Sequence, residues 1–321
     1  MNRQTFESLH QERWNAFETM LDELDGKNPP EQSAQFPAMF RQVCSDLSLA
    51  QQRMYGLRLC ERLNVMVIRG HKHLYRSSAR LGEGVLRFIA VDFPRAFRKD
   101  IKLFWINCVF FLIPLAGIIL GSMIEPRWSH ALLGTEQMSQ LQSMYGSDSP
   151  VEHLREQFGS NFMMFAFYIM NNIGIDFRIF AGGILCGVGT LFFIVFNGLF
   201  FGAATAYIHE AANPESFYNF ICGHASVEIM GMLVAGMAGL HVGLGILYSG
   251  QRGRKQALLD AGKRSIPFLY GAALLTFLAA IIEGFWSAQP VAAPIKYTVA
   301  TFWFVALVAY FTFAGRQEDE A

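Results

Sequence analysis

A Gly-rich stretch with few charged residues, from Asn161 to Gly250, limits the possible folds of this chain more than any other feature of its sequence. Segments this long and apolar cross a bilayer as helices, in which every backbone polar group is satisfied internally. The stretch nevertheless contains three amides, an imidazole and a carboxylate: Asn171, Asn172, Asn197, His224 and Glu228. Each of these groups costs free energy in hydrocarbon unless it has a partner. We therefore expect them to face the interior of a helix bundle or a cavity, as a polar intramembrane site.

The composition of the whole chain agrees with a membrane protein. Of its 321 residues, 52% are hydrophobic and only 16% are charged, and the apolar residues come in blocks. The fold class we predict is all-α, a polytopic membrane helix bundle. Lys and Arg concentrate at residues 69–102 and 252–264, which sets membrane topology and does not indicate nucleic-acid binding. The first twenty residues contain no apolar run, which predicts no cleavable signal peptide, and the five cysteines show no metal-binding spacing.

Residues 1–80 are predicted to form a cytoplasmic helical domain. Their apolar residues recur at three- and four-residue intervals, with a break at Gly26 and the following prolines. This part ends in a basic run, from Arg69 to Arg80, for which lipid headgroups or solvent are better partners than nucleic acid. Residues 81–100 mix apolar with basic side chains around Pro94, which predicts an interfacial elbow helix before the first membrane span.

Residues 101–315 are predicted to form the transmembrane bundle. Residues 125–160 are polar and more acidic than basic, so we place them in an external loop, whereas the basic residues 252–264 should be cytoplasmic. The chain between these loops must then cross an odd number of times, and three crossings fit its length. Arg178 is then inside and residues 210–215 are outside. The six predicted spans are Ile101–Ile124, Ser160–Ile175, Phe177–His209, Phe217–Tyr248, Ile266–Phe285 and Tyr297–Phe313, with residues 316–321 as a cytoplasmic tail.

Small residues recur four apart in the predicted spans. The glycines concerned are Gly117 and Gly121, Gly183 and Gly187, Gly198 and Gly202, and Gly239 and Gly243, with Gly189 close by. Residues at i and i+4 share a helix face, and glycines there let helix backbones approach closely. We expect these glycines to pack helices together within a compact bundle. A homodimer formed through the same helix faces is the alternative.

His224 and Glu228 are four residues apart and so share one helix face, with about 6 Å between them. Three interpretations compete: a structural hydrogen bond or ion pair, a path for protons or a polar solute, and a metal site. The metal site is the least favoured, because zinc needs a third protein ligand that the sequence does not single out. Without an HExxH, GxSxG or Walker motif, neither a metalloprotease, a serine hydrolase nor an ATPase is expected. We therefore predict no catalytic residue, no metal and no cofactor.

The amides have plain structural interpretations as well. Asn171 and Asn172 fall at the cytoplasmic end of a short predicted span, where a turn or helix cap is expected. Asn197, followed by Gly198, is in mid-span, where an amide usually bonds to a neighbouring helix. The predicted topology puts His224 in the outer half of its helix, so Asn171 and Asn172 should lie apart from it. Asn197, His224 and Glu228 are expected to meet within the bundle.

The order of these features resembles the stage II sporulation protein M family over about residues 85–250. Members carry an Asn-Asn pair, a GxGT stretch, an Asn-Gly pair and a His followed four residues later by Glu. In this chain the matching residues are Asn171 and Asn172; Gly187, Gly189 and Thr190; Asn197 and Gly198; and His224 and Glu228. Ala225 departs from the Gly that usually follows the His.

The resemblance implies an integral membrane protein. In the sporulation branch, such a protein belongs to a complex with peptidoglycan-degrading enzymes and supplies no chemistry itself. In the longer, non-sporulation branch, relatives tend to be encoded beside a MoxR-type AAA+ ATPase and a von Willebrand A-like protein. The helical domain at residues 1–80, absent from the short sporulation proteins, would be the docking surface for such partners.

We therefore expect a non-enzymatic scaffold of the bacterial inner membrane, with both termini cytoplasmic, that recruits partners and is linked to envelope or peptidoglycan remodelling. The alternative is a channel or transporter that uses the polar site around His224 and Glu228. An intramembrane hydrolase is a third and weaker interpretation, and it requires a third ligand or a nucleophile beside His224. A water path through the bundle would favour transport. A bundle packed shut, with an exposed apolar patch on residues 1–80, would favour scaffolding.

Overall fold

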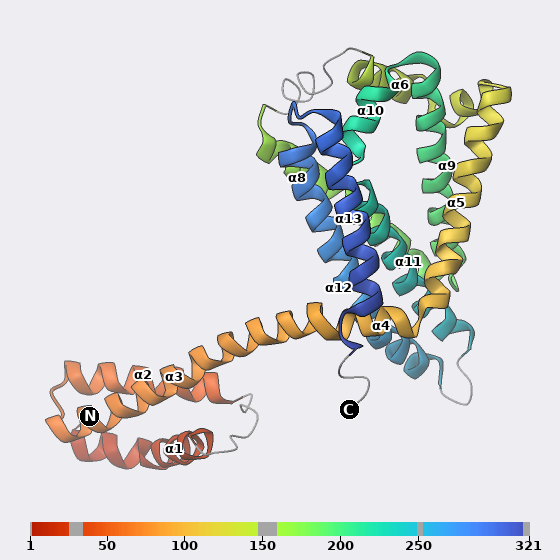
Figure 1. Ribbon diagram of the computed structural model, residues 1–321. Helices are drawn as coiled ribbons and strands as arrows, with labels where there is room; N and C mark the ends of the chain where they lie inside the picture. The colour runs from red at the N-terminus through yellow and green to blue at the C-terminus, as the bar shows by residue number, and fades with distance from the viewer. Residues whose placement is uncertain (1, 26–34, 147–158, 249–252, 317–321) are drawn as a thin grey trace. The chain divides into compact units, whose positions relative to one another are not determined.

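Every regular element among residues 2–25, 35–146, 159–248 and 253–316, which the computed structural model describes, is helical (Figure 1). Five of the described helical segments are long and apolar enough to cross a membrane. The predicted all-α, polytopic membrane fold is therefore confirmed. The chain divides into two units, Met1–Arg87 and Phe88–Ala321. The predicted acidic tail, Arg252 and residues 147–158 of the predicted external loop lie outside the described residues.

The first unit consists of three helices, α1 (Arg3–Leu24), α2 (Phe36–Gln52) and α3 (Leu57–Arg87). The side chain of Asn2 begins α1 by accepting a hydrogen bond from the backbone N–H of Thr5, which satisfies one of the free donors of the first turn. The apolar face predicted for this segment is buried, except that Leu9 is 66% exposed. The centre of this core is made of Phe6, Trp14, Phe17, Leu21, Phe36, Leu63 and Met66.

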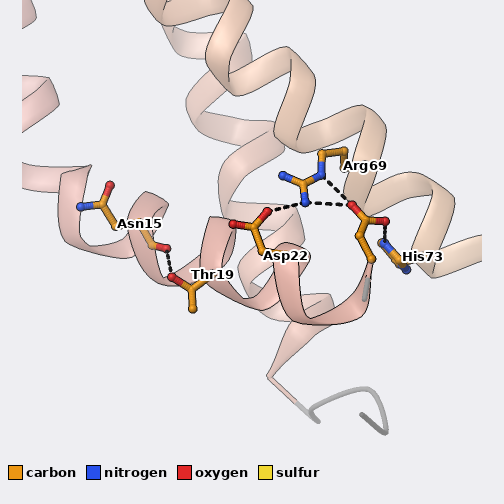
Figure 2. Close-up of polar contacts among 6 residues, drawn as sticks. Asn15, Thr19, Asp22, Arg69 and His73 are labelled. Carbon is orange, nitrogen blue, oxygen red and sulfur yellow. Dashed lines mark hydrogen bonds and ion pairs between the residues drawn. The ribbon is translucent and has the colours of Figure 1, made fainter. Parts of the chain in front are cut away.

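Charged side chains tie α3 to the end of α1 (Figure 2). Arg69 donates hydrogen bonds to Asp22 and Asp25 at 2.6 and 2.9 Å, and His73 Nε2 lies 2.8 Å from Asp25 Oδ1. Two members of the predicted basic run thus pair with carboxylates of their own unit, and the Arg69 pairs lie at its solvent-exposed surface. The Arg69 hydrogen bond, helped by His73, lowers the pKa of Asp25. The pairing therefore contributes stability above the ordinary Asp pKa of about 3.9, and this contribution is lost as pH falls through the lowered pKa.

The second unit begins with a short π-helical turn, η1 (Phe88–Asp92), followed by α4 (Phe93–Lys99) and the first long apolar helix, α5 (Ile101–Ile124). Pro94 lies in the first turn of α4, where its missing N–H is not needed, as the predicted elbow required. The first half of the segment predicted as an external loop forms the helix α6 (Arg127–Tyr145). No helix was predicted here because the segment is polar and lacks a regular apolar face. The buried residues of α6 are only Ser129, Leu133 and Tyr145.

The rest of the bundle follows α6. It comprises α8 (Asn161–Ala181), η2 (Gly182–Ile184), α9 (Val188–Ala211), α10 (Pro214–Ile221), α11 (Ala225–Leu247), α12 (Arg254–Ile282), η3 (Glu283–Ser287) and α13 (Ala293–Phe313). The five candidate spans are α5, α9, α11, α12 with η3, and α13. Helix α8 is 21 residues long, but polar residues interrupt its apolar sequence. It is the sixth long helix of the bundle, and it occupies the place of the short predicted span.

Two of the predicted span boundaries are wrong. Residues 177–209 do not form one helix, because η2 and Gly187, with φ at 83°, separate α8 from α9. A left-handed φ of this kind suits glycine and stops a helix. Residues 217–248 are likewise divided between α10 and α11, with the break just before His224.

Contacts at the helix ends show that successive long helices run in opposite directions. At one end of the bundle, His241 near the end of α11 lies 3.1 Å from Asp100, just before α5. At the other end, His130 at the start of α6 lies 3.1 Å from Glu210 at the end of α9. In Figure 1, α5, α9 and α12 accordingly run one way, and α8, α11 and α13 run the other. Three long helices thus lie between residues 160 and 250, as three crossings require.

Glycines bring several of these helices into backbone contact. A Cβ built on Gly183 would lie 2.2 Å from the carbonyl oxygen of Gly239, and one on Gly243 would lie 2.3 Å from the backbone nitrogen of Gly187. Further close approaches among the glycines named from the sequence are Gly189 to Gly182, Gly198 to Phe111, Gly202 to Leu115 and Ile118, and Gly121 to the ring of Trp128. Gly117 differs, because no atom lies within 4 Å of a Cβ built there. The end of the bundle formed by η2 and the second half of α11 is therefore closely packed.

Candidate functional site

Three side chains with potential metal-binding atoms converge inside the bundle. His224 immediately precedes α11, Glu228 lies in the first turn of this helix, and Glu283 begins η3. The Nε2 atom of His224 lies 3.9 Å from Glu228 Oε2 and 3.7 Å from Glu283 Oε1. One ligand atom from each residue lies within 4.8 Å of the other two. We call these three residues the HEE cluster.

The HEE cluster is largely shielded from solvent. His224 is 2% exposed and Glu283 is 6% exposed, while Glu228 is half-buried. The close approach of neighbouring elements explains this burial, because a Cβ on Gly284 would lie 2.8 Å from the backbone of Phe165 in α8. A Cβ on Gly223 would similarly lie 2.5 Å from the ring of Trp286. The glycines on both sides of the cluster thus allow α8, η3 and the start of α11 to meet.

The turn η3 also orients the imidazole. His224 Nδ1 lies 2.8 Å from the hydroxyl oxygen of Ser287, which leaves Nε2 directed at the two carboxylates. The carbonyl oxygen of Ser287 accepts a hydrogen bond of 2.8 Å from the ammonium group of Lys296, which is 4% exposed. A π-helical turn places residues differently from an α-helix and is frequent at functional sites. Here it presents Glu283 and Ser287 to the same imidazole.

The amide pair joins this site, contrary to the prediction that it lies apart from His224. Asn172 donates a hydrogen bond of 3.4 Å to Glu283 Oε2, and Asn171 donates one of 2.9 Å to Asn172 Oδ1. The prediction was wrong because the span was expected to end at Ile175, whereas α8 continues to Ala181. Asn172 is therefore inside the bundle and not at its edge.

The other predicted amide is not part of the cluster. Asn197 donates a hydrogen bond of 2.8 Å to the carbonyl oxygen of Phe193 in its own helix. Its neighbour Gly198 faces the backbone of Phe111 in α5. The expected meeting of Asn197 with His224 and Glu228 is therefore not seen, and this part of α9 serves helix contact.

A cavity of about 310 Å³ adjoins the HEE cluster. It lies between α5, α6, α8, α9, α10 and α11, and its polar lining includes Tyr145, Tyr168, Asn171, His224, Glu228 and Glu283. A much smaller void of about 10 Å³ shares Asn172 and Glu228 with it and reaches Asp176 and Thr276. The Thr276 hydroxyl donates a hydrogen bond to Asp176. Polar groups thus continue from the large cavity into the tightly packed middle of the bundle.

The sequence interpretation missed the contributions of Glu283, Asp176 and Lys296. Each is a charged residue type inside a long apolar segment, and such residues usually mark a functional site in membrane proteins. That signal was available for all three. What the sequence did not reveal was that Glu283 and His224 meet, because they are 59 residues apart and η3 is not predictable from apolar spacing.

The HEE cluster offers one imidazole nitrogen and two carboxylates to a cavity, which suits the binding of a cation or a hydrogen-bonding solute. In comparisons with known proteins, the family model described as stage II sporulation protein M matches residues 107–288. A second model, described as a domain of unknown function (DUF8413), matches residues 4–76. No curated protein and no solved structure matches the chain. The whole HEE cluster lies inside the first match.

Proposed function

The chain belongs to the stage II sporulation protein M family, and from this membership we propose that it is a non-enzymatic scaffold of the bacterial inner membrane. The helical bundle anchors the protein, and the first unit recruits cytoplasmic partners for envelope or peptidoglycan remodelling. The observation that carries this proposal is the division of the chain into a membrane bundle and a separate three-helix unit with its own core.

The surface of α3 supports a docking role for the first unit. Leu57, Val65 and Ile68 are 82%, 50% and 60% exposed. At about 100° per residue, these three side chains lie within about 80° of one another around the helix. Large apolar side chains gathered on one exposed face commonly mark a protein contact. By family resemblance, we propose a MoxR-type AAA+ ATPase and a von Willebrand A-like protein as the partners.

Site-specific cross-linking tests this role. A photoreactive residue placed at Val65 or Ile68 of the full chain in native membranes should cross-link to one of these two proteins, identified by mass spectrometry. The same residue at the exposed Ser48 of α2 is the matched control. Equal cross-linking at Ser48 and Val65, or products that contain neither partner, would count against the scaffold.

The proposed topology has both termini in the cytoplasm and six crossings. Reporters fused at residues 140, 212 and 290 should then give an external signal, and one at residue 258 should give a cytoplasmic signal. The reason is the excess of Lys and Arg near residue 258 and the near absence of basic residues near residue 212. A cytoplasmic signal at residue 212 would rule out three crossings between residues 160 and 250.

A second candidate function is transport, and the polar cavity of about 310 Å³ favours it. The neighbouring void at Asp176 measures only about 10 Å³, and η2 and α11 are in close backbone contact through their glycines. This close packing supports the scaffold over an open channel. Transport would instead be favoured if the wild-type protein took up a solute into proteoliposomes and the Glu283→Gln variant did not.

A further inference from the structure

We propose that His224, Glu228 and Glu283 bind one divalent transition-metal ion, for which Zn²⁺ is the representative, at the wall of the bundle cavity. The scaffold function does not require this site, so the two proposals stand or fall separately. A metal site was the least favoured interpretation of His224 and Glu228 because no third ligand was evident, and the structure places Glu283 of η3 in that position.

The distances within the HEE cluster are close to those around a bound ion. Zinc bonds of 2.0 to 2.1 Å in tetrahedral geometry place two ligand atoms about 3.3 Å apart. The observed separations from His224 Nε2 are 3.7 Å to Glu283 and 3.9 Å to Glu228. Contraction by about half an ångström would bring each of these two pairs to the separation around one ion, and the ligand atoms of the two carboxylates, which lie within 4.8 Å of each other, would have to approach as well.

A second layer of hydrogen bonds already orients two of the three ligands. Ser287 contacts Nδ1 of His224, so the opposite ring nitrogen faces the cluster. Asn172 donates to Oε2 of Glu283 while Oε1 of the same carboxylate faces the imidazole. Metal-bound histidines and carboxylates typically have outer partners of this kind, which fix their tautomer and direction.

The charges of the cluster also call for a cation. Two carboxyl groups lie together with little exposure to water, and such groups are stable in a protein interior only when they are protonated, paired or bound to a metal. The nearest ammonium group, that of Lys296, donates to the Ser287 carbonyl oxygen and supplies one positive charge. A divalent ion at the centre of the cluster would contact both carboxylates directly, which Lys296 does not do. The competing arrangement is a proton held between Glu228 and Glu283, which needs no metal.

The ligand set narrows the identity of the ion. An imidazole favours Zn²⁺, Fe²⁺ or Ni²⁺ over Mg²⁺, Ca²⁺ and Mn²⁺, which suit oxygen ligands, and the absence of a thiolate from the cluster disfavours Cu⁺. Three protein ligands leave at least one coordination position vacant. Because all three residues line the cavity, this position is open to water or a small solute.

Metal analysis of the purified full chain tests the site. The detergent-solubilised protein is treated with EDTA, reloaded with ZnCl₂, passed through a desalting column and measured by mass spectrometry of the metal. We expect one zinc per chain in the wild type and at least tenfold less in His224→Ala and Glu283→Gln. The matched control is Asp176→Asn, which alters another buried carboxylate of the same bundle outside the cluster and should retain the zinc.

A second variant keeps the test decisive if the ligand variants fold poorly. Asn172→Ala leaves all three ligands in place but removes the hydrogen bond to Glu283, so zinc affinity should fall by 10- to 100-fold with stoichiometry retained at saturation. Zinc should also raise the melting temperature of the wild type and Asp176→Asn, but not that of Glu283→Gln. A well-folded wild type that retains no zinc, or equal zinc in the wild type and Glu283→Gln, would overturn the proposal and favour the shared proton.

Discussion

Gly243→Ala should destabilise the membrane bundle by about 3 kcal/mol, because a methyl group at this position would overlap the backbone of the turn between η2 and α9. Its Cβ would lie 2.3 Å from the nitrogen and 2.5 Å from the Cα of Gly187, which lies in the turn between η2 and α9 and belongs to neither element. These are backbone atoms, which cannot rotate away as a side chain can. Relief would require α11 to separate from the turn before α9, and the contact between Gly183 and Gly239 would loosen as well. Reversible unfolding by SDS in mixed micelles measures the change.

Gly117→Ala is the matched control for this prediction. Gly117 lies in another long helix, α5, and a Cβ there meets no atom within 4 Å. Alanine is a better helix former than glycine by about 1 kcal/mol, so this variant should be unchanged or slightly more stable. Equal stability of the two variants would show that the glycine contacts contribute nothing to the bundle.

Trp14→Ala should destabilise the first unit by 3 to 5 kcal/mol, the usual cost of removing a large aromatic side chain from a core. The Trp14 side chain is fully buried, and its indole N–H donates a hydrogen bond of 2.9 Å to Asp46 Oδ2. The substitution therefore leaves a cavity and also takes a partner from a buried carboxylate. A loss of this size approaches the whole stability of a domain of this length.

Limited proteolysis of the intact protein measures the destabilisation caused by Trp14→Ala, because the rate of cleavage within residues 2–87 reports on opening of the first unit. Leu9→Ala is the control, since it truncates a side chain on the same helix that is 66% exposed. It should change the cleavage rate little. Similar rates for the two variants would contradict the assignment of Trp14 to the centre of the core.

The fold was largely predictable because hydrophobicity determines it. The long apolar segment Ile101–Ile124 is a single helix with the predicted bounds, and the spacing of apolar residues in α1 identified most of its buried side chains. Boundaries inside the Gly-rich stretch were not predictable in the same way. A glycine in a membrane segment can either allow close helix packing or end a helix. The positive φ of Gly187 shows that the helix is interrupted at this residue, and the sequence does not reveal that angle.

The candidate site was only half predictable, for a different reason. His224 and Glu228 lie one helical turn apart, so their proximity follows from local geometry. Glu283 and Asn172 join them through the packing of α8 and η3 against the start of α11, and no local rule gives that contact. Asn197 was expected to join the site but does not. Its amide instead donates a hydrogen bond to a backbone carbonyl oxygen of the preceding turn of its own helix.

The order in which the cluster residues occur along the chain has a consequence for biogenesis. His224 and Glu228 emerge from the ribosome before Glu283, and the α12 segment separates them. An isolated α11 would therefore carry an imidazole and a carboxylate into the bilayer without their later partner, at a cost that hydrocarbon does not offset. Insertion of α11 and α12 together, as one helical hairpin, avoids that intermediate. We therefore expect the end of α12 to enter the membrane together with α11, because only then does Glu283 reach His224.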